Sequence, residues 1–167
     1  MFDNGVWSDH INDRDFDERK FWDKLNQTVR RQKPVWVVTP DKVADRDETL
    51  RRWDRYAPIL IQANIPMFMA VQDGMTPEDV PSEAAGIFVG GSTDWKWRNL
   101  RMWTETFNRV HVGRVNTYRL LDMAHRAGAE SVDGSGWFRG DQNQTAQLEQ
   151  FLEETTNGKQ IEQGELI

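Results

Sequence analysis

Acidic, amide and glycine residues recur at the points where short apolar runs of this chain end. In parallel α/β sheets, binding and catalytic groups collect where strands end and loops begin. Glycines let a ligand approach the backbone, and the side chains of Gln72 and Asp41 offer donors and acceptors for the edge of a planar heterocycle. Turn formation and helix capping explain any single loop equally well, but six loops in one register favour a binding site. The loops are Asp3–Gly5, Pro40–Asp41, Gln72–Gly74, Gly90–Thr93, Gly113–Asn116 and Asp133–Gly136.

Two of these loops carry carboxylates that could share one cavity. Asp3 and Asp133 are far apart in sequence, yet they become neighbours if the sheet curls far enough. A pair of carboxylates in different environments suits displacement at a glycosidic carbon, because one can attack the carbon while the other handles the proton of the departing group. Residue spacing alone does not say which bond would be cleaved.

The elements that must position these loops alternate between strand and helix patterns. Short β-branched or aromatic runs predict strands, and segments with apolar residues at helical spacing predict helices. Asp15 is the expected N-cap of the first helix, with Glu18 three residues later, and Pro58 is expected to end or kink the second. The predicted strands are 1–4, 35–39, 67–71, 86–89, 110–112 and 131–132. The predicted helices are 16–32, 44–63, a short one after Thr76, 99–108, 117–127 and 145–154.

This alternation predicts an α/β fold of the (β/α)8 or TIM-barrel type. About six βα units are recognisable in 167 residues, whereas eight units normally take about 250 residues. The barrel is therefore expected to be compact or incomplete. We place it in residues 1–140, followed by a C-terminal helix and acidic tail in 141–167, with a frayed tail after residue 154.

The amino-acid composition excludes several classes of site. The chain has no Cys, which excludes disulfides, thiolate metal sites and a cysteine nucleophile. Its three His are scattered, so we predict no metal and no cofactor. No apolar run reaches the roughly 20 residues of a membrane helix, and the acidic start is unlike a signal peptide. We expect a cytoplasmic protein that does not contact a membrane.

The charge is unevenly distributed. A formal net charge of −6 argues against an extended polyanion-binding surface, but basic residues outnumber acidic ones between Lys96 and Arg126. Lys96 and Arg114 follow predicted strands and are the better phosphate-contact candidates. Trp95, Trp97 and Trp103 could stack on bases or lie in the core, and the core is favoured for Trp103. His111 alternates with two valines, so it points either toward the site or into the core, and a structural role is favoured.

The loop motifs resemble those of the tRNA-guanine transglycosylase superfamily, and most of all those of short phage-encoded relatives that use queuine or other 7-deazaguanines. The resemblance covers roughly residues 1–140, and the combination of motifs is more specific than any one of them. The segments that carry it are Asp3–Gly5, Val38–Asp41, Val71–Met75, Phe88–Lys96, His111–Asn116 and Glu130–Gly134.

The resemblance implies a barrel enzyme that exchanges guanine for a 7-deazaguanine, of the preQ0 kind, through a covalent aspartyl-glycosyl intermediate. Asp133 matches the nucleophile, and Asp3 matches the aspartate that contacts the base and transfers protons. Asp41 and Gln72 match positions that hydrogen-bond the guanine edge, and Gly91 matches a backbone contact to the base. The substrate-binding set is thus Asn4, Asp41, Gln72, Gly90, Gly91 and Ser92, and the nucleic-acid-binding set is Lys96, Arg114 and Asn116.

Departures from the family pattern shape the expected partners. Members that act on tRNA hold a Cys-rich zinc subdomain, and its absence here favours DNA as the polymer. Asp73 stands where the family usually has glycine and Asn4 where it has serine, so base preference could differ. A phage-encoded enzyme would work in the host cytoplasm.

Three alternatives remain open at this stage. A second copy of the chain or a partner chain could supply the rest of the barrel. The enzyme could instead hydrolyse or salvage a free deazaguanine nucleoside. Finally, the protein could be a non-catalytic (deaza)guanine- or nucleic-acid-binding protein that retains the barrel's pocket.

Overall fold

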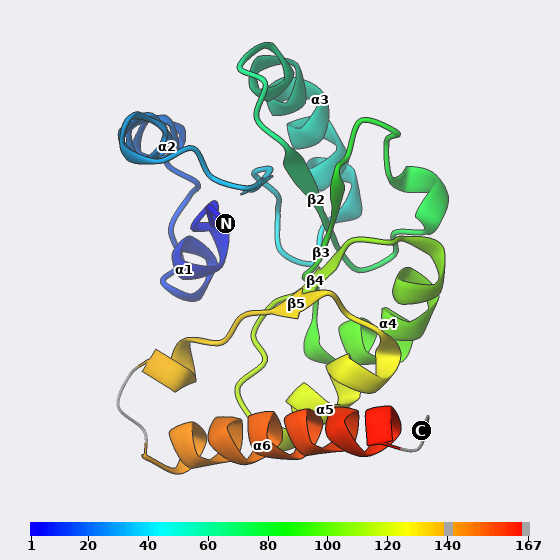
Figure 1. The fold of residues 1–167 in the computed structure, drawn as a ribbon. Coiled ribbons are helices and arrows are strands. Elements are labelled where there is room, and N and C mark those ends of the chain that lie inside the picture. Colours follow the sequence, from blue (N-terminus) through cyan, green and yellow to red (C-terminus); the bar gives the residue numbers. More distant parts are fainter. Residues whose placement is uncertain (139–141, 165–167) are drawn as a thin grey trace.

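The computed structural model describes residues 1–138 and 142–164 and shows five strands in one parallel sheet. Neighbours in the sheet are also neighbours in the chain, in the order β1-β2-β3-β4-β5, and the sheet curls as half a barrel (Figure 1). Phe2 pairs with Val37 in a parallel bridge, which sets the N-terminus beside the first strand. The strands are β1 (Val37–Val38), β2 (Met67–Val71), β3 (Gly86–Val89), β4 (Val110–Val112) and β5 (Ser131–Val132).

Helices connect the strands, as parallel pairing requires. A 3₁₀ turn, η1 (Pro77–Asp79), makes the connection between β2 and β3, and a second, η2 (Ser135–Phe138), follows β5. In the described part of the chain the α-helices are α1 (Val6–Ile11), α2 (Glu18–Arg31), α3 (Arg46–Gln62), α4 (Thr93–Thr106), α5 (Tyr118–Ala127) and α6 (Gln142–Gly164). None of these helices combines the length and apolar character that crossing a bilayer requires.

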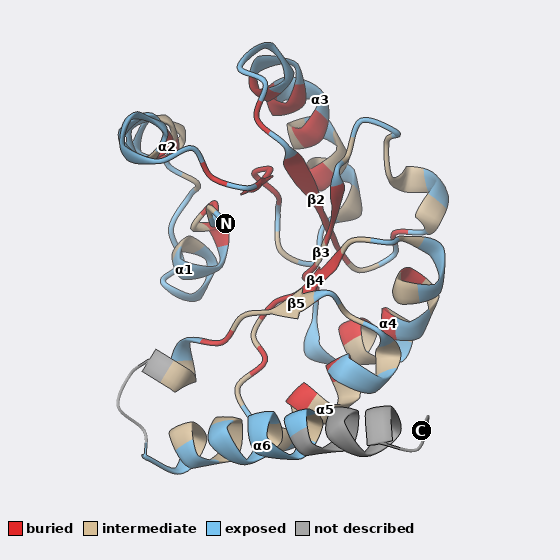
Figure 2. Ribbon diagram, in the orientation of Figure 1, coloured by how far each residue is buried: buried red, intermediate tan, exposed pale blue. Residues whose placement is uncertain are grey.

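The main core lies between the sheet and its helices. Alternate strand residues such as Val37, Met69 and Ile87 join buried residues of α2 to α5 in one cluster, which includes Leu60 and Trp103. Figure 2 shows β2, β3 and β4 as largely buried, whereas β5 is of intermediate burial. Burial of both sheet faces explains why the strands read as nearly continuous apolar runs.

The opposite face of the sheet carries a smaller aromatic cluster. Trp36, Val38, Phe68 and Ala70 are buried there, with Phe88 packed against them. The rings of Trp36 and Phe68 stack with their centroids 4.1 Å apart. Side chains alternate along a strand, so these residues point away from the main core. They lie on the face of the sheet that leads to the polar loops.

The sequence predicted the parallel α/β class and most strand positions. Strands at 67–71, 86–89, 110–112 and 131–132 are confirmed. The run 35–39 forms only Val37–Val38, and the first strand is reduced to the single Phe2 bridge. The boundary predicted between residues 140 and 141 lies outside the described residues.

Several helix ends were predicted wrongly. Asp17, not Asp15, caps α2, because the Asp17 side chain accepts a hydrogen bond from Lys20 N. α3 (Arg46–Gln62) matches the predicted range 44–63 closely, and Pro58 does not end it, since Ala57 and Leu60 anchor its last turns in the core.

Two further helices also differ from the prediction. α4 begins at Thr93, directly after Ser92, rather than at Asn99. α6 runs on to Gly164 instead of fraying after residue 154. It packs against α5, where Tyr118 N donates to the side chain of Gln147.

Two apolar helix residues face solvent. Val29 of α2 is 38% exposed and Ile59 of α3 is 47% exposed. Each helix therefore buries a narrower stripe than its apolar content suggested. α1 was not predicted at all, because its six residues contain too few apolar positions to show a helical period.

Candidate functional site

A cavity of about 750 Å³ opens at the ends of the strands. Each strand contributes a loop to its wall, so the cavity lies where parallel α/β folds bind ligands. Most of the predicted site residues line it together: Asp3, Asn4, Asp41, Gln72, Gly90, Gly91, Arg114, Asn116 and Asp133. Residues of six loops that are far apart in the sequence thus line one cavity.

Asp133 directly follows β5 and is held by the neighbouring β4 loop. Its Oδ1 accepts a hydrogen bond of 2.7 Å from Arg114 N, and its Oδ2 lies 3.5 Å from His111 Nε2. Burial by itself would raise the pKa of Asp133, but the His111 ring and the Arg114 N–H outweigh it and hold that pKa below its ordinary value. Lys96 acts in the same direction. Asp133 is therefore ionised at neutral pH.

The pKa of Asp3 is shifted in the opposite direction from that of Asp133. It is open to solvent at the cavity but crowded by protein atoms, and this partial burial raises its pKa. Hydrogen bonding from Gly5 N opposes the rise, whereas the negative charge of Asp133 adds to it. The two carboxylates therefore interact across one cavity, with pKa values moved in opposite directions.

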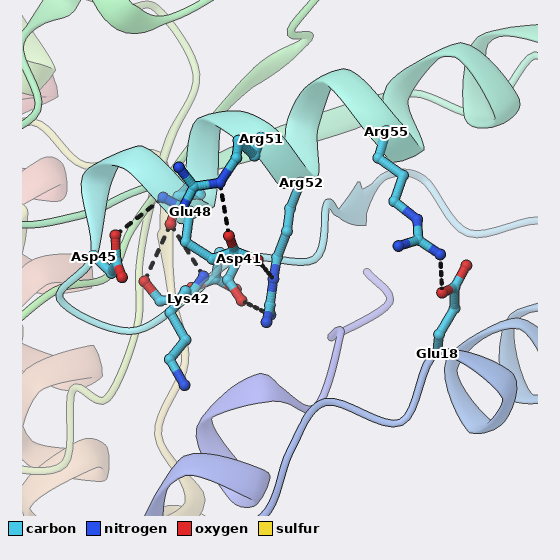
Figure 3. A network of polar contacts seen from close by, with 9 residues as sticks. Glu18, Asp41, Lys42, Asp45, Glu48, Arg51, Arg52 and Arg55 are labelled. Atoms are coloured by element: carbon cyan, nitrogen blue, oxygen red, sulfur yellow. Dashed lines mark hydrogen bonds and ion pairs between the residues drawn. The ribbon is translucent and has the colours of Figure 1, made fainter.

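Asp41 forms the centre of a buried amide network. Its Oδ1 accepts from Asn4 Nδ2 at 2.6 Å and its Oδ2 accepts from Gln72 Nε2 at 2.7 Å. Burial raises the pKa of Asp41 to about 6 despite the Asn4 hydrogen bond. Arg52 of α3 donates to the backbone oxygen of Asp41 and pairs with Glu48, as Figure 3 shows.

Gln72 joins the same network to the next loop. Its Oε1 accepts from Gly91 N at 2.9 Å and from Ala44 N at 3.0 Å. Asp41 and Gln72 thus direct most of their hydrogen-bonding capacity at the protein itself. They lock the loops after β1, β2 and β3 into a preformed cavity floor, which Gly90 and Gly91 also line.

Close packing explains why positions 90 and 91 are occupied by glycine. Gly91 has φ +70°, and a Cβ there would come within 2.6 Å of Asp73 Oδ2. Gly90 has no room either, since its Cβ would lie 2.6 Å from Gln72 Nε2. Asp73 in turn accepts from Ser92 N at 2.7 Å and from Ser92 Oγ at 2.5 Å. Ser92 is thereby committed to Asp73 and is not among the cavity-lining residues, which does not fit the substrate contact predicted for it.

Lys96 does not fit its predicted phosphate contact. The side chain is 2% exposed, and Nζ donates to the backbone oxygen of Gly113. Burial, with the nearby Arg114 charge, lowers the pKa of Lys96 to about 7. The physical reason is helical phase: once α4 begins at Thr93, Lys96 shares the inward face with Leu100 and Trp103. Trp103 is a core residue, as predicted.

Arg114 and Asn116 do reach the cavity. Arg114 has φ +62°, an uncommon conformation for a residue with a side chain. Its guanidinium donates to Gly91 O and lies 4.0 Å from the centroid of the Trp7 ring. Asn116 Oδ1 accepts from Gly136 N at 2.9 Å, tying the β4 and β5 loops together.

Sequence reasoning missed several parts of the cavity wall. Trp7 of α1, Trp137 of η2 and Leu148 of α6 all line it. Trp137 Nε1 donates to Val115 O at 2.7 Å, which fixes its ring. In the sequence, the only signal for this role of Trp137 is its place in the glycine- and serine-rich segment after Asp133. Among the described residues no group of three or more acidic or His side chains gathers as a metal site would require.

Comparison of the chain with protein-family models, with curated proteins and with solved structures finds no match. The function is therefore inferred from the cavity and from the loop motifs.

Proposed function

We propose that the protein is a base-exchange transglycosylase that replaces guanine in nucleic acid by a 7-deazaguanine. The observation that carries this proposal is the pair Asp3 and Asp133, two carboxylates on one cavity whose pKa values are shifted in opposite directions. Such pairs divide nucleophile and acid–base roles between two otherwise similar groups. The half-barrel would then be a partial version of the TIM barrel that the resemblance implies.

The proposed reaction has two balanced halves. An Asp133 oxygen attacks C1′ of the nucleotide, the C1′–N9 bond breaks, and its electron pair leaves with guanine, whose N9 takes a proton from Asp3. The incoming 7-deazaguanine then gives its N9 proton to Asp3 and attacks C1′, which releases the Asp133 carboxylate. Asp133 is suited to attack because it is ionised, and Asp3 is suited to proton transfer because its pKa is raised.

The cavity walls support a flat polar ligand. Gly90 and Gly91 line the cavity without side chains, and Trp7 and Trp137 supply aromatic faces against which a base could stack. Arg114 and Asn116 line the cavity and are the candidates for binding nucleic acid. Lys96 is not a candidate because it is buried. DNA is the proposed polymer because the chain has no Cys for the zinc subdomain of tRNA-directed relatives.

A non-catalytic (deaza)guanine-binding protein is the second candidate. It is favoured by the Asn4, Asp41 and Gln72 network, whose polar atoms are already paired within the protein. A rigid, preformed pocket of this kind can hold a base without performing chemistry.

Base exchange can be measured directly. The protein is incubated with DNA and radiolabelled preQ0, the DNA is digested to nucleosides, and the label in deoxynucleosides is counted. We expect Asp133→Asn to lose at least 10³-fold of the wild-type rate, as loss of a nucleophile does. Asp94→Asn, at an α4 side chain that is 85% exposed, serves as the matched control and should retain the rate.

Two results would separate the candidates. No incorporation by the wild-type protein, or equal incorporation by Asp133→Asn, refutes the transglycosylase. Calorimetric binding of guanine or preQ0 without any exchange would instead support the binding protein.

A further inference from the structure

His111 lies in the middle of β4 and is enclosed by the aromatic face of the sheet. Its side chain is 3% exposed. The ring stacks on Phe88 of β3 with centroids 5.2 Å apart, and it meets the Trp36 ring in a T-shaped arrangement with centroids 5.1 Å apart. It does not line the cavity itself, so any role in chemistry must pass through a neighbour.

The two ring nitrogens of His111 face the same neighbouring strand region. Nδ1 lies 2.8 Å from Ser131 Oγ, and Nε2 lies 3.5 Å from Asp133 Oδ2. The register of the sheet produces this arrangement, because His111 pairs with Ser131 and residues two apart on a strand share a face.

Nε2 is a buried polar atom without a hydrogen-bond partner. Buried nitrogens of this kind are rarely left unpaired, and each one calls for an explanation. A distance of 3.5 Å is longer than an ordinary N–H···O bond, but hydrogen bonds in empty active sites often tighten only when substrate is present. At this distance from Nε2 lies the carboxylate of Asp133, the proposed nucleophile.

We propose that Ser131, His111 and Asp133 form a hydrogen-bonded relay, centred on the buried His111 ring, that positions the nucleophile. Ser131 donates its hydroxyl hydrogen to Nδ1, so the neutral imidazole carries its hydrogen on Nε2 and directs it at Asp133 Oδ2. With Arg114 N–H on Oδ1, the carboxylate is then fixed by donors on both oxygens. His111 is a positioning residue, and the inference rests on the proposed function.

The relay would act at both halves of the exchange. The hydrogen on Nε2 stabilises the ionised carboxylate of Asp133 before it attacks C1′. It stabilises the same carboxylate again when the ester bond between Asp133 and C1′ breaks. No proton moves along the relay, because His111 keeps its hydrogen throughout. The other charged groups that face Asp133 are Lys96, from α4, the guanidinium of Arg114, from the loop after β4, and Asp3, from the N-terminal segment.

Two substitutions at one position separate hydrogen bonding from packing. His111→Phe keeps an aromatic ring against Phe88 and removes both nitrogens, whereas His111→Gln keeps an N–H that can reach Asp133. Misplacing a reacting group by about 1 Å costs about 100-fold in rate, so we expect His111→Phe to lose about 100-fold in kcat with KM within threefold. His111→Gln should recover at least tenfold of that loss. His125→Gln, at an exposed position of α5, controls for the loss of a histidine and should match the wild type.

A pH profile distinguishes the relay from simple packing. His111 holds the pKa of Asp133 down, so its removal raises that pKa. The acidic limb of the kcat/KM profile should therefore move to higher pH in His111→Phe. A purely structural histidine would lower the activity without moving this limb.

Nitrogen-15 NMR of the histidine rings tests the relay without any turnover. We expect the His111 ring to be the neutral Nε2–H form, with a resonance that moves in Asp133→Asn and in Ser131→Ala. If wild type exchanges no base but this resonance behaves as stated, the proposed function fails and the relay stands. If wild type is active while His111→Phe stays within twofold in kcat with an unmoved acidic limb, or if the ring carries its hydrogen on Nδ1, the relay is refuted.

Discussion

Lys96 offers a direct test of how the interior of this fold treats charge. The side chain is 2% exposed and its Nζ donates to the backbone oxygen of Gly113. Burial lowers its pKa from 10.5 to about 7. We therefore expect Lys96→Met, which keeps most of the side-chain volume and removes the amine, to abolish one pH-dependent component of stability.

The sign follows from proton binding. Between pH 7.5 and 9.5 the folded chain holds Lys96 mostly neutral with its pKa near 7, while the unfolded chain holds it charged with its pKa at 10.5. Unfolding then takes up close to one proton, so stability rises with pH by up to about 1.4 kcal/mol per unit. Across these two pH units the gain in the free energy of unfolding approaches about 2.5 kcal/mol.

Urea denaturation followed by tryptophan fluorescence measures this gain at each pH. The quantity to compare is the difference between wild type and Lys96→Met, because other titrating groups then cancel. That difference should shift by about 2.5 kcal/mol in favour of wild type as the pH rises from 7.5 to 9.5. Lys33→Met, at an exposed loop position, provides the matched control and should show no such shift.

A difference between wild type and Lys96→Met that stays constant over this range would refute the reasoning. It would mean that Lys96 is charged in the folded protein and solvated or paired there. The loop after β4 would then be held by a cation rather than by a neutral amine, and the electrostatic environment of Asp133 would need to be assigned again.

Two further predictions concern the cavity floor. Burial raises the pKa of Asp41 from 3.8 to about 6, so ionisation of Asp41 weakens the folded state as the pH rises through that range. The stability of Asp41→Asn relative to wild type should therefore increase by about 2.4 kcal/mol between pH 4 and pH 7.5 in urea titrations, and a flat difference would contradict the assignment. Gly91 and Gly74 have φ +70° and +81°, but only at Gly91 would a Cβ meet other atoms, at 2.6 Å from Asp73 Oδ2. Gly91→Ala should therefore lower the free energy of unfolding by about 1–3 kcal/mol more than Gly74→Ala, and equal losses in thermal denaturation would show that crowding at Gly91 is relieved.

The strands and the loops that end them could be read from the sequence because their signals are local. An apolar run such as Met67–Val71 buries both faces, and the glycine or acidic residue that follows marks its end. The same locality explains the failures at helix ends. The choice between Asp15 and Asp17 as cap, and between Thr93 and Asn99 as start, depends on which turn packs against the sheet.

Local sequence signals could not reveal the roles of the polar residues. Asp41 meets Asn4 and Gln72, which are 37 and 31 residues away in the chain, so sequence alone could not show that these groups bind one another. Lys96 looked like a surface cation until the helical phase of α4 turned it toward the core.

The sequence by itself therefore determined which loops gather at the cavity, because parallel strands in consecutive order must end at one edge of the sheet. The tertiary structure alone decided which of their side chains stay free for a ligand. It paired Asp41 and Gln72 with each other, buried Lys96 under the β4 loop, and set His111 behind Asp133. The physical reason is that a buried polar group takes whichever partner the register of the sheet brings within reach, and that register depends on residues far apart in the chain.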